Sequence, residues 1–458
     1  MKKKTFEVPH SLAIIFLAMV LASILTYIIP GGSFERVVNE AGKTVVVPGS
    51  FHYIDKTPVN PLSVLDYVFD GLKSAGEIIF ALLCSGGSLG IVLSTGMFQG
   101  AACTLSRKAK GKEWVVITFL MAVFAVLCIP INLNYFIPFA TLGIVIALAM
   151  GYDAIVGISI IMLGGAVGFS CGAMNLPNTG TAQGIAELPT FSGMGYRLFC
   201  MLPFFIVTVL YVLHYASRIK KDPSRSYTYG MRQEIDNASV DQLPEFERKH
   251  IPVAVVVCVS IAYMIYTAIF SSLSFKSSAA IFLYMGLLSG IVYQMPVNDI
   301  CRQFISGVKG MASTGILLGF AYAISGILSR GNVMDTVVNL LANALNYFPR
   351  MFQAPAMFLM HIIINLFVTS GSGQAAVTMP VFIPVADLVG MSRQTAVLAF
   401  NFGDGFCNFI LPHAAATMGF IGLANIPFTK WFLYAAKLFL LWVAIGIVLL
   451  MAATVIGY

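Results

Sequence analysis

Charged side chains are scarce in this sequence of 458 residues. Only 10% of its residues are charged, whereas about a quarter are charged in an ordinary soluble domain. The chain is 58% hydrophobic, and its mean hydropathy is +0.86. So little charge excludes a soluble globular fold, and we predict an all-α polytopic membrane protein.

The sequence also lacks a cysteine pattern that would hold a metal or a set of disulfides. Its eight cysteines are scattered singly, mostly within apolar runs. We expect them to be packing residues, and we expect no cofactor other than Na⁺ or H⁺ as a coupling ion. The net charge of +7 does not indicate nucleic acid as a partner, because the basic residues lie in short loops beside apolar runs.

Apolar runs follow one another along the whole chain. The first, at about 10–30, follows Lys2, Lys3 and Lys4, and we interpret it as a retained helix with a cytoplasmic amino terminus. Residues 33–58 predict a small strand pair, and 61–75 an amphipathic interfacial helix. The predicted units are the first helix and its cap (1–75), a first repeat (76–217), a cytoplasmic linker (218–249), scaffold helices (250–308) and a second repeat (309–458).

Four polar segments interrupt these apolar runs. At 130–134 (PINLN) and 369–374 (TSGSGQ) the flanking runs are shorter than the roughly 20 residues of a spanning helix, which predicts re-entrant hairpins with tips at membrane depth. A turn between two full crossings is the alternative for 369–374. At 172–181 and 401–413 the polar residues predict broken transmembrane helices. Irregular backbone at this depth is tolerated where it lines a cavity.

Weak identities relate the two halves. The matched segments are 93–96 with 328–331, Gly151 with Gly390, 164–165 with 403–404, and 184–189 with 422–427, at offsets of 235, 239, 239 and 238 residues. Four matches in order at a nearly constant offset indicate an internal repeat. Because the first hairpin enters from the cytoplasm and the second from outside, the repeats are predicted to be inverted, as in secondary transporters.

Four motifs carry a resemblance to a known family: 151–157 (GYDAIVG), 180–189 (GTAQGIAELP), 370–376 (SGSGQAA) and 402–405 (FGDG). They resemble YfcC-type carriers of the C4-dicarboxylate anaerobic carrier (DcuC-like) group, in the ion transporter superfamily, over nearly the whole chain. The resemblance implies a homodimer in the bacterial cytoplasmic membrane, with a scaffold domain and a transport domain that moves as an elevator. It implies substrates among dicarboxylates, amino acids and small peptides.

Two positions depart from the family pattern. The first hairpin tip reads Asn132-Leu133-Asn134, where family members usually carry acidic residues, and this change favours a neutral or anionic substrate over a cationic one. After Pro412 the family usually has Thr-Ser, whereas His413 follows here. A histidine at this position could receive a carboxylate or carry a proton.

Amide and hydroxyl side chains at the breaks are the candidate ligands, since they suit Na⁺ or a zwitterion. Alternatively they cap the ends of half-helices. For substrate binding the candidates are Asn132, Asn134, Asn178, Thr179, Ser370, Ser372, Gln374, Asn408 and His413. For ion coupling they are Asp404, Asn175 and Asn401, with Na⁺ held at Asn132, Asn178, Ser370 and Ser372.

Asp404 is the main carboxylate predicted to lie deep within a span, and an intramembrane acid is by default a functional hypothesis. It could carry a proton, bind Na⁺ or hold an amine, or it could form a structural pair with Asn401. The other ionisable residues within or beside spans are expected to be packed or to anchor span ends at the interface. They are His214, His361, Glu187, Asp387, Arg197 and Arg393.

The function predicted from these features is secondary active transport of a small carboxylate-bearing solute, an amino acid or a C4-dicarboxylate, by ion coupling or exchange. An antiporter of basic amino acids or a small-peptide carrier is the alternative. A channel would need a continuous polar stripe, and a membrane-embedded hydrolase would need a nucleophile beside a base. Because the sequence has neither, we predict that the protein is not an enzyme.

Overall fold

A computed structural model describes residues 11–38, 44–47, 49–108, 111–231, 246–270 and 273–458. These residues are mostly helical, and seven of their helices are long and apolar enough to cross a membrane. The seven are α3 (Gly76–Ser94), α7 with its continuation (Ala154–Ile185), α9 (Met194–Lys221), α10 (His250–Phe270), α11 (Phe275–Val292), α12 (Val297–Arg330) and α18 (Phe428–Ile456). A helical multi-pass membrane protein is therefore confirmed. The amino-terminal lysines and most of the predicted linker lie outside the described residues.

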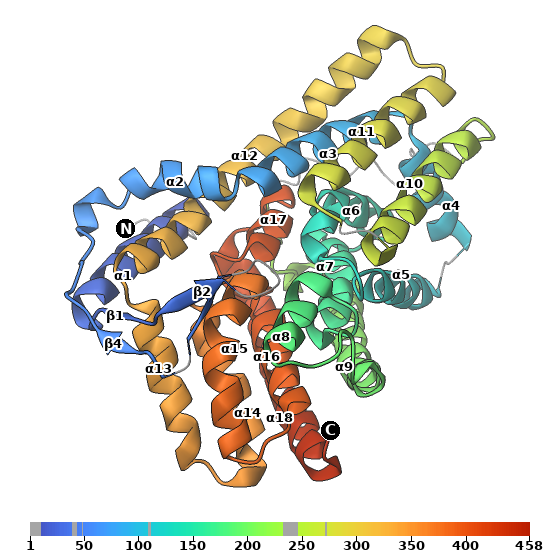
Figure 1. Cartoon of the computed structure of the whole chain (residues 1–458). Coiled ribbons are helices and arrows are strands. Elements are labelled where there is room, and N and C mark those ends of the chain that lie inside the picture. Colours follow the sequence, from blue (N-terminus) through green and yellow to red (C-terminus); the bar gives the residue numbers. More distant parts are fainter. Residues whose placement is uncertain (1–10, 39–43, 48, 109–110, 232–245, 271–272) are drawn as a thin grey trace, which may run out of the picture.

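A scaffold group of helices packs along one side of the molecule (Figure 1). In this group α12 crosses α1 (Ser11–Ile28), α2 (Asp66–Ser74) and α3, while α11 packs on α3 and α10. Glycines let α3 and α12 approach, since a Cβ on Gly307 would lie 2.3 Å from the Gly86 carbonyl oxygen. Between α1 and α2 lies a cap of two antiparallel strand pairs and a short helix, namely β1 (Gly32–Ser33) with β4 (His52–Tyr53), β2 (Arg36–Val38) with β3 (Thr44–Val46), and η1 (Pro61–Ser63).

In the first half, two short helical arms pack on the central helix α7. The elements, in chain order, are α4 (Met97–Lys108), α5 (Glu113–Leu127), η2 (Leu133–Phe139), α6 (Ala140–Ala149), α7 (Ala154–Cys171), the π-helical turn η3 (Leu176–Gly180), α8 (Thr181–Ile185) and α9. The chain leaves α-helical geometry between α5 and α6, where η2 is a 3-10 helix, and again between α7 and α8. Helix α9 runs on to Lys221, so the linker begins later than residue 218 and opens with η4 (Pro223–Arg225).

The second half has the same order of elements around α16. They are α13 (Met334–Ala344), η6 (Leu345–Tyr347), α14 (Arg350–Asn365), α15 (Gly371–Leu388), α16 (Arg393–Cys407), α17 (Ala415–Leu423) and α18, with α14 and α15 both packed on α16. The predicted break at 401–413 is too long. Helix α16 continues without interruption through Asn401 and Asp404, and the irregular segment covers 408–414, where Pro412 cannot extend a helix.

Left-handed backbone positions also match between the halves. Gly151 (φ 80°) and Gly390 (φ 73°) end α6 and α15. Two non-glycine residues, Glu187 (φ 55°) and Asn425 (φ 50°), follow α8 and α17 at an offset of 238. Such φ values are uncommon outside glycine, so equal backbone turns at equivalent positions are an independent likeness between the halves.

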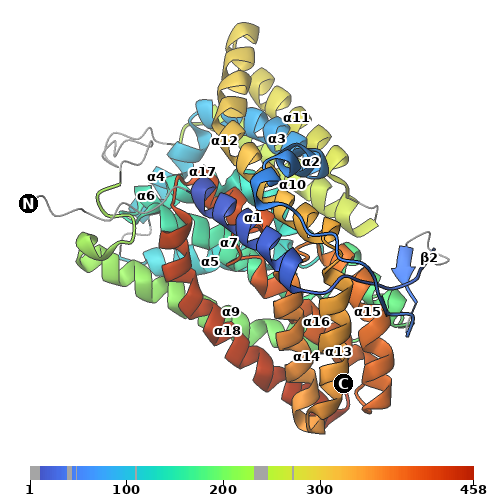
Figure 2. The same ribbon diagram turned by 90° about the vertical axis from the view of Figure 1, so that its left-hand side faces the viewer.

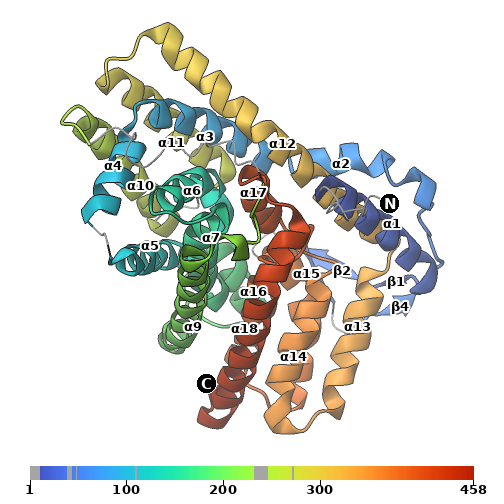
Figure 3. The same cartoon turned by 180° about the vertical axis from the view of Figure 1, so that it is seen from behind.

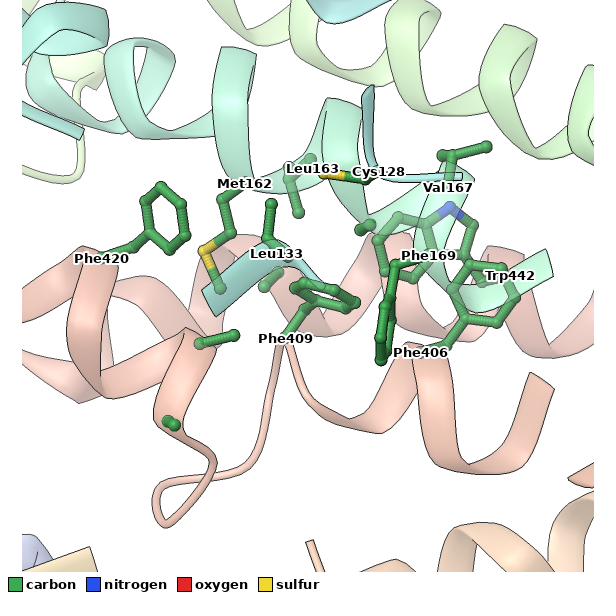
Figure 4. Close-up of a cluster of buried hydrophobic side chains, with 14 of the residues drawn as sticks. Cys128, Leu133, Met162, Leu163, Val167, Phe169, Phe406, Phe409, Phe420 and Trp442 are labelled. Atoms are coloured by element: carbon green, nitrogen blue, oxygen red, sulfur yellow. The ribbon is translucent and has the colours of Figure 1, made fainter. Parts of the chain in front are cut away.

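The two central helices α7 and α16 pack against each other and are enclosed by the rest of the molecule (Figures 2 and 3). All of α7 is buried, as is α16 from Thr395 to Cys407. Figure 4 shows the apolar core beside them, where Leu133, Phe169, Phe406, Phe409 and Trp442 come from five different segments. The rings of Phe406 and Trp442 lie 4.8 Å apart. This core holds irregular segments of both halves against the central helices.

Replacement of Gly168 by alanine tests the close packing of α5 on α7. A Cβ there would lie 1.9 Å from the Ala125 carbonyl oxygen, so the helices must separate, and overpacking of this kind costs about 1–3 kcal/mol. We expect Gly168→Ala to lower the melting temperature of the purified protein in detergent. The matched control is Gly195→Ala, where a Cβ meets no atom within 4 Å. Equal melting temperatures for the two variants would contradict this packing.

Candidate functional site

One cavity of about 210 Å³ is lined by residues from all four interrupted segments. Its wall also includes side chains from the scaffold helices α3, α11 and α12. The lining residues are Asn132, Leu133, Asn134 and Tyr135 at the first tip, Phe169, Pro177 and Asn178 at the first broken helix, Thr369, Ser370, Gly371 and Ser372 at the second tip, Asn408, Phe409, Ala415 and Ala416 at the second broken helix, and Ile78, Phe275 and Tyr322 from the scaffold. This wall mixes polar and apolar side chains, and none of the described residues that line it is charged.

Helices begin at the cavity in each interrupted segment. Asn132 Oδ1 accepts the Asn134 backbone N–H at 2.9 Å, and Ser370 Oγ accepts that of Gly373 at 3.3 Å. Asn175 Oδ1 accepts the Asn178 N–H at 3.1 Å, so these three residues do cap helix starts. The amino end of α17, by contrast, follows Ala414 and has no side-chain cap. Its first N–H groups can therefore receive an anionic group from the cavity.

Six of the nine predicted substrate-binding residues line the cavity: Asn132, Asn134, Asn178, Ser370, Ser372 and Asn408. All four predicted Na⁺ ligands are among these six. Thr179, Gln374 and His413 are buried behind the wall instead. His413 Nε2 has no hydrogen-bond partner among the residues that the structure describes. The three predicted ion-coupling residues, Asp404, Asn175 and Asn401, are buried in the same layer.

Asp404 is the centre of this second layer and is fully buried. Its Oδ2 accepts a hydrogen bond from Asn178 Nδ2 at 2.6 Å, and its Oδ1 accepts one from Asn365 Nδ2 at 3.0 Å. Asn408 Nδ2 donates to the Asp404 carbonyl oxygen at 2.8 Å. Asn365 Nδ2 also lies 2.8 Å from Gln374 Oε1. The carboxylate thus ties α16 to the first broken helix and to one arm of the second hairpin, and Asn365 links that arm to Gln374 in the other arm.

The alternative pair of Asp404 with Asn401 does not form. Asn401 Nδ2 donates to Thr179 Oγ1 at 3.0 Å, and its Oδ1 accepts from Arg197 Nη1. Arg197 Nη1 also donates to the Gly172 carbonyl oxygen at 3.2 Å, where α7 ends. The expectation that Arg197 anchors a span end at the interface is wrong, because this side chain is fully buried. It holds the end of α7 against α16.

Three residues were missing from the predicted site: Arg197 and Asn365 in this layer, and Gly371 in the cavity wall. Gly371 lines the cavity, and a Cβ on it would lie 2.8 Å from Asp404 Oδ2. Asn365 is an isolated amide in an apolar run shortly before the second tip, which is the signal that could have found it. For Arg197 the comparable signal is a lone cation at the start of α9, far from the basic residues of its last turn.

The remaining ionisable candidates lie away from the cavity. Arg393 forms exposed ion pairs with Glu187 at 2.8 Å and with Asp387 at 2.9 Å. His361 is buried, with its ring 4.8 Å from that of Phe382. His214 lies on the exposed surface of α9. None of these residues contributes to the cavity wall.

Comparison with known proteins identifies the family. The family model of the C4-dicarboxylate anaerobic carrier, DcuC, matches residues 8–455. The chain belongs to this family. It is 30% identical to a protein of Escherichia coli K12 named "Putative basic amino acid antiporter YfcC", over 99% of this chain and 98% of that one. It is 25% identical to an uncharacterized protein of Haemophilus influenzae, over 98% and 97% of the two chains.

Two solved structures of transporters also match this member of the carrier family. One is the YdaH transporter of Alcanivorax borkumensis, with a TM-score of 0.43 and 17% identity over 98% of this chain and 99% of that one. The other is MtrF of Neisseria gonorrhoeae, described as an antimetabolite efflux pump, with a TM-score of 0.44 and 16% identity over 97% and 95%. The family, rather than these distant structures, establishes that the chain is a transporter.

Arg197→Met tests the buried contacts at the end of α7. The substitution leaves the Gly172 carbonyl and Asn401 Oδ1 without this donor, and a stranded buried acceptor costs about 1–3 kcal/mol. The control is Arg393→Met, which removes exposed ion pairs worth about 0–1 kcal/mol. We expect a clearly larger loss of thermal stability for Arg197→Met. Similar losses in both variants would show that Arg197 has no special structural role.

Proposed function

We propose that this carrier is a secondary active transporter that moves a small carboxylate-bearing solute, an amino acid or a C4-dicarboxylate, by ion coupling or exchange. The convergence of four interrupted segments on one cavity carries this proposal. Two come from each half of the chain, and interrupted helices that meet between repeats are where secondary transporters bind substrate and ion. The bacterial cytoplasmic membrane is the proposed location.

A carboxylate is the proposed recognition group because the wall presents N–H groups, hydroxyls and amides but no acid. The uncapped start of α17 has a partial positive charge, which favours an anion. Hydroxyl and amide side chains at Ser370, Ser372 and Asn134 can orient the rest of the solute. A volume of about 210 Å³ suits a small solute better than a peptide.

The proposed motion follows from the arrangement of the halves. Equal element order around α7 and α16, with equivalent left-handed turns, supports an internal repeat, and we propose that the two copies are inverted. The helices that carry the four breaks would move together as a transport domain against α3, α11 and α12, which supply the other side of the cavity wall. We propose an elevator movement of this kind in a homodimer, with access alternating between the two sides of the membrane.

An antiporter of basic amino acids is the second candidate, since a relative carries that name. A cationic side chain would need a carboxylate in the cavity, and the described wall has none. Asp404 is not among the residues that line the cavity; it lies behind Gly371, where an added Cβ would lie 2.8 Å from its Oδ2. A channel and a hydrolase are disfavoured, because the polar residues gather at the breaks and form no described nucleophile–base pair at the wall.

Transport by the purified protein in liposomes tests the proposal. Uptake of radiolabelled succinate, aspartate, alanine and arginine would be measured with an inward Na⁺ gradient, an inward proton gradient, or internal solute for exchange. We expect accumulation or exchange of at least one of succinate, aspartate and alanine. This transport should saturate and should be competed by the same unlabelled solute. Conductance without saturation would instead show a channel, and transport of arginine alone would support the antiporter of basic amino acids.

Asn134→Asp is expected to weaken binding of an anionic solute by at least about ten-fold. The added carboxylate lies in the cavity wall, where like charge opposes an anion at short distance. Asn346→Asp on the exposed surface is the control for net charge. Competition of labelled-solute uptake by unlabelled solute gives the apparent affinities. An unchanged affinity in Asn134→Asp would place the anion elsewhere.

A further inference from the structure

The Asp404 carboxylate has only neutral partners in the part of the chain that the structure describes. Its contacts are amide groups from Asn178 and Asn365, and it takes part in no ion pair there. A fully buried carboxylate at membrane depth is costly unless a cation balances its charge or a proton removes it. Arg197 lies in the same layer but donates to a backbone carbonyl, an amide and a phenol instead.

The two amides that contact Asp404 each have an oxygen left over. Asn178 Oδ1 and Asn365 Oδ1 are both buried and have no hydrogen-bond partner among the described residues. Buried amide oxygens are normally satisfied, so two beside one carboxylate require an explanation. Gln374 Oε1 adds another oxygen, 2.8 Å from Asn365 Nδ2. The cluster therefore holds more oxygen acceptors than the side chains themselves can satisfy.

We propose that Asp404, Asn178 and Asn365 form a Na⁺ site behind the cavity, with Gln374 beside it. The inference rests on the proposed function in one respect, since it names the coupling ion. In the described arrangement the amide nitrogens face the carboxylate. Rotation of both amides would turn their oxygens toward the same point, so that Na⁺ takes the place of the two N–H donors.

Charge balance selects a monovalent ion. One carboxylate and neutral amides cancel a single positive charge, whereas a divalent cation would leave the buried site with an uncompensated charge. The described ligands are oxygens, and the described residues hold no cluster of histidine, cysteine and acidic side chains that would favour a transition metal. Na⁺ bound here would leave this layer neutral.

Gly371 separates this site from the solute cavity. It lines the cavity, and a Cβ on it would lie 2.8 Å from Asp404 Oδ2 and 2.9 Å from Asn178 Nδ2. Only a glycine lets the second tip approach the carboxylate so closely. Bound Na⁺ would join the second hairpin to the broken helix of the first half, because Asn365 ends one arm of that hairpin and Asn178 belongs to the broken helix. The ion would thereby order the wall that the solute contacts.

Thermal unfolding of the purified full-length protein, without any solute, tests the site. Melting curves would be recorded over a NaCl series in which choline chloride keeps the ionic strength constant, at pH 6 and pH 8, with KCl in parallel. We expect a saturable rise in melting temperature with Na⁺ that K⁺ does not reproduce. A rise that depends on pH and not on Na⁺ would overturn the proposal in favour of a proton.

The variants separate the site from general effects of salt. Asp404→Asn keeps the shape of the side chain and should raise the Na⁺ concentration for half-maximal stabilisation at least ten-fold. Gly371→Ala should also weaken Na⁺ stabilisation, because its Cβ intrudes at Asp404 and Asn178. Asp387→Asn removes an exposed carboxylate and should leave the Na⁺ response unchanged. A wild-type response in both Asp404→Asn and Gly371→Ala would overturn the proposal.

This test is independent of the transported solute. Na⁺ stabilisation that is lost in Asp404→Asn supports the site even if none of the tested solutes is transported, in which case only the proposed function fails. Solute transport that needs no Na⁺, in a protein that Na⁺ does not stabilise, supports the proposed function and removes the Na⁺ site. The proposed transport function and the proposed Na⁺ site can therefore be rejected independently of each other.

Discussion

The need to satisfy polar backbone groups within a membrane governs this structure. Four segments between apolar helices leave α-helical geometry, and lipid offers no hydrogen bonds to such backbone. Capping side chains at Asn132, Asn175 and Ser370 meet part of the need locally. Contacts between distant segments supply further hydrogen bonds, such as the one that Arg197 donates to the carbonyl at the end of α7. The four interrupted segments therefore line one cavity, because lipid cannot form hydrogen bonds with their polar backbone groups.

Asp404 places a carboxylate directly behind the cavity wall. The cavity wall is neutral, while the carboxylate lies one residue behind it, next to Gly371. The proposed solute and the proposed cation would thus be bound close together, with Asn178 both in the cavity wall and beside Asp404. Such proximity is a physical basis for coupling, since each charge lowers the cost of burying the other. Gly371 is essential to this proximity, because any larger residue there would separate the cavity wall from the Asp404 carboxylate.

Packing of the central helices gives the site its rigidity. Helices α7 and α16 are buried along almost their whole lengths, and the arms of each hairpin lie directly on them. Close approaches at Gly168 and Gly403 leave no room for a side chain. The scaffold helices contribute Ile78, Phe275 and Tyr322 to the cavity wall. A solute would therefore be held between a rigid group of broken helices and a separate scaffold surface.

Sequence alone determined the membrane class, the places where helices are interrupted and six cavity-lining residues, because apolar length, glycine and amide clusters are local features. The continuation of α16 through Asn401 and Asp404 was not evident, since polar residues in a helix look like a break when their partners are unknown. Tertiary structure alone decided that Asn178 meets Asp404, 226 residues away, and that Arg197 is buried. Those contacts depend on how α7 and α16 pack, and no local pattern in the sequence records that packing.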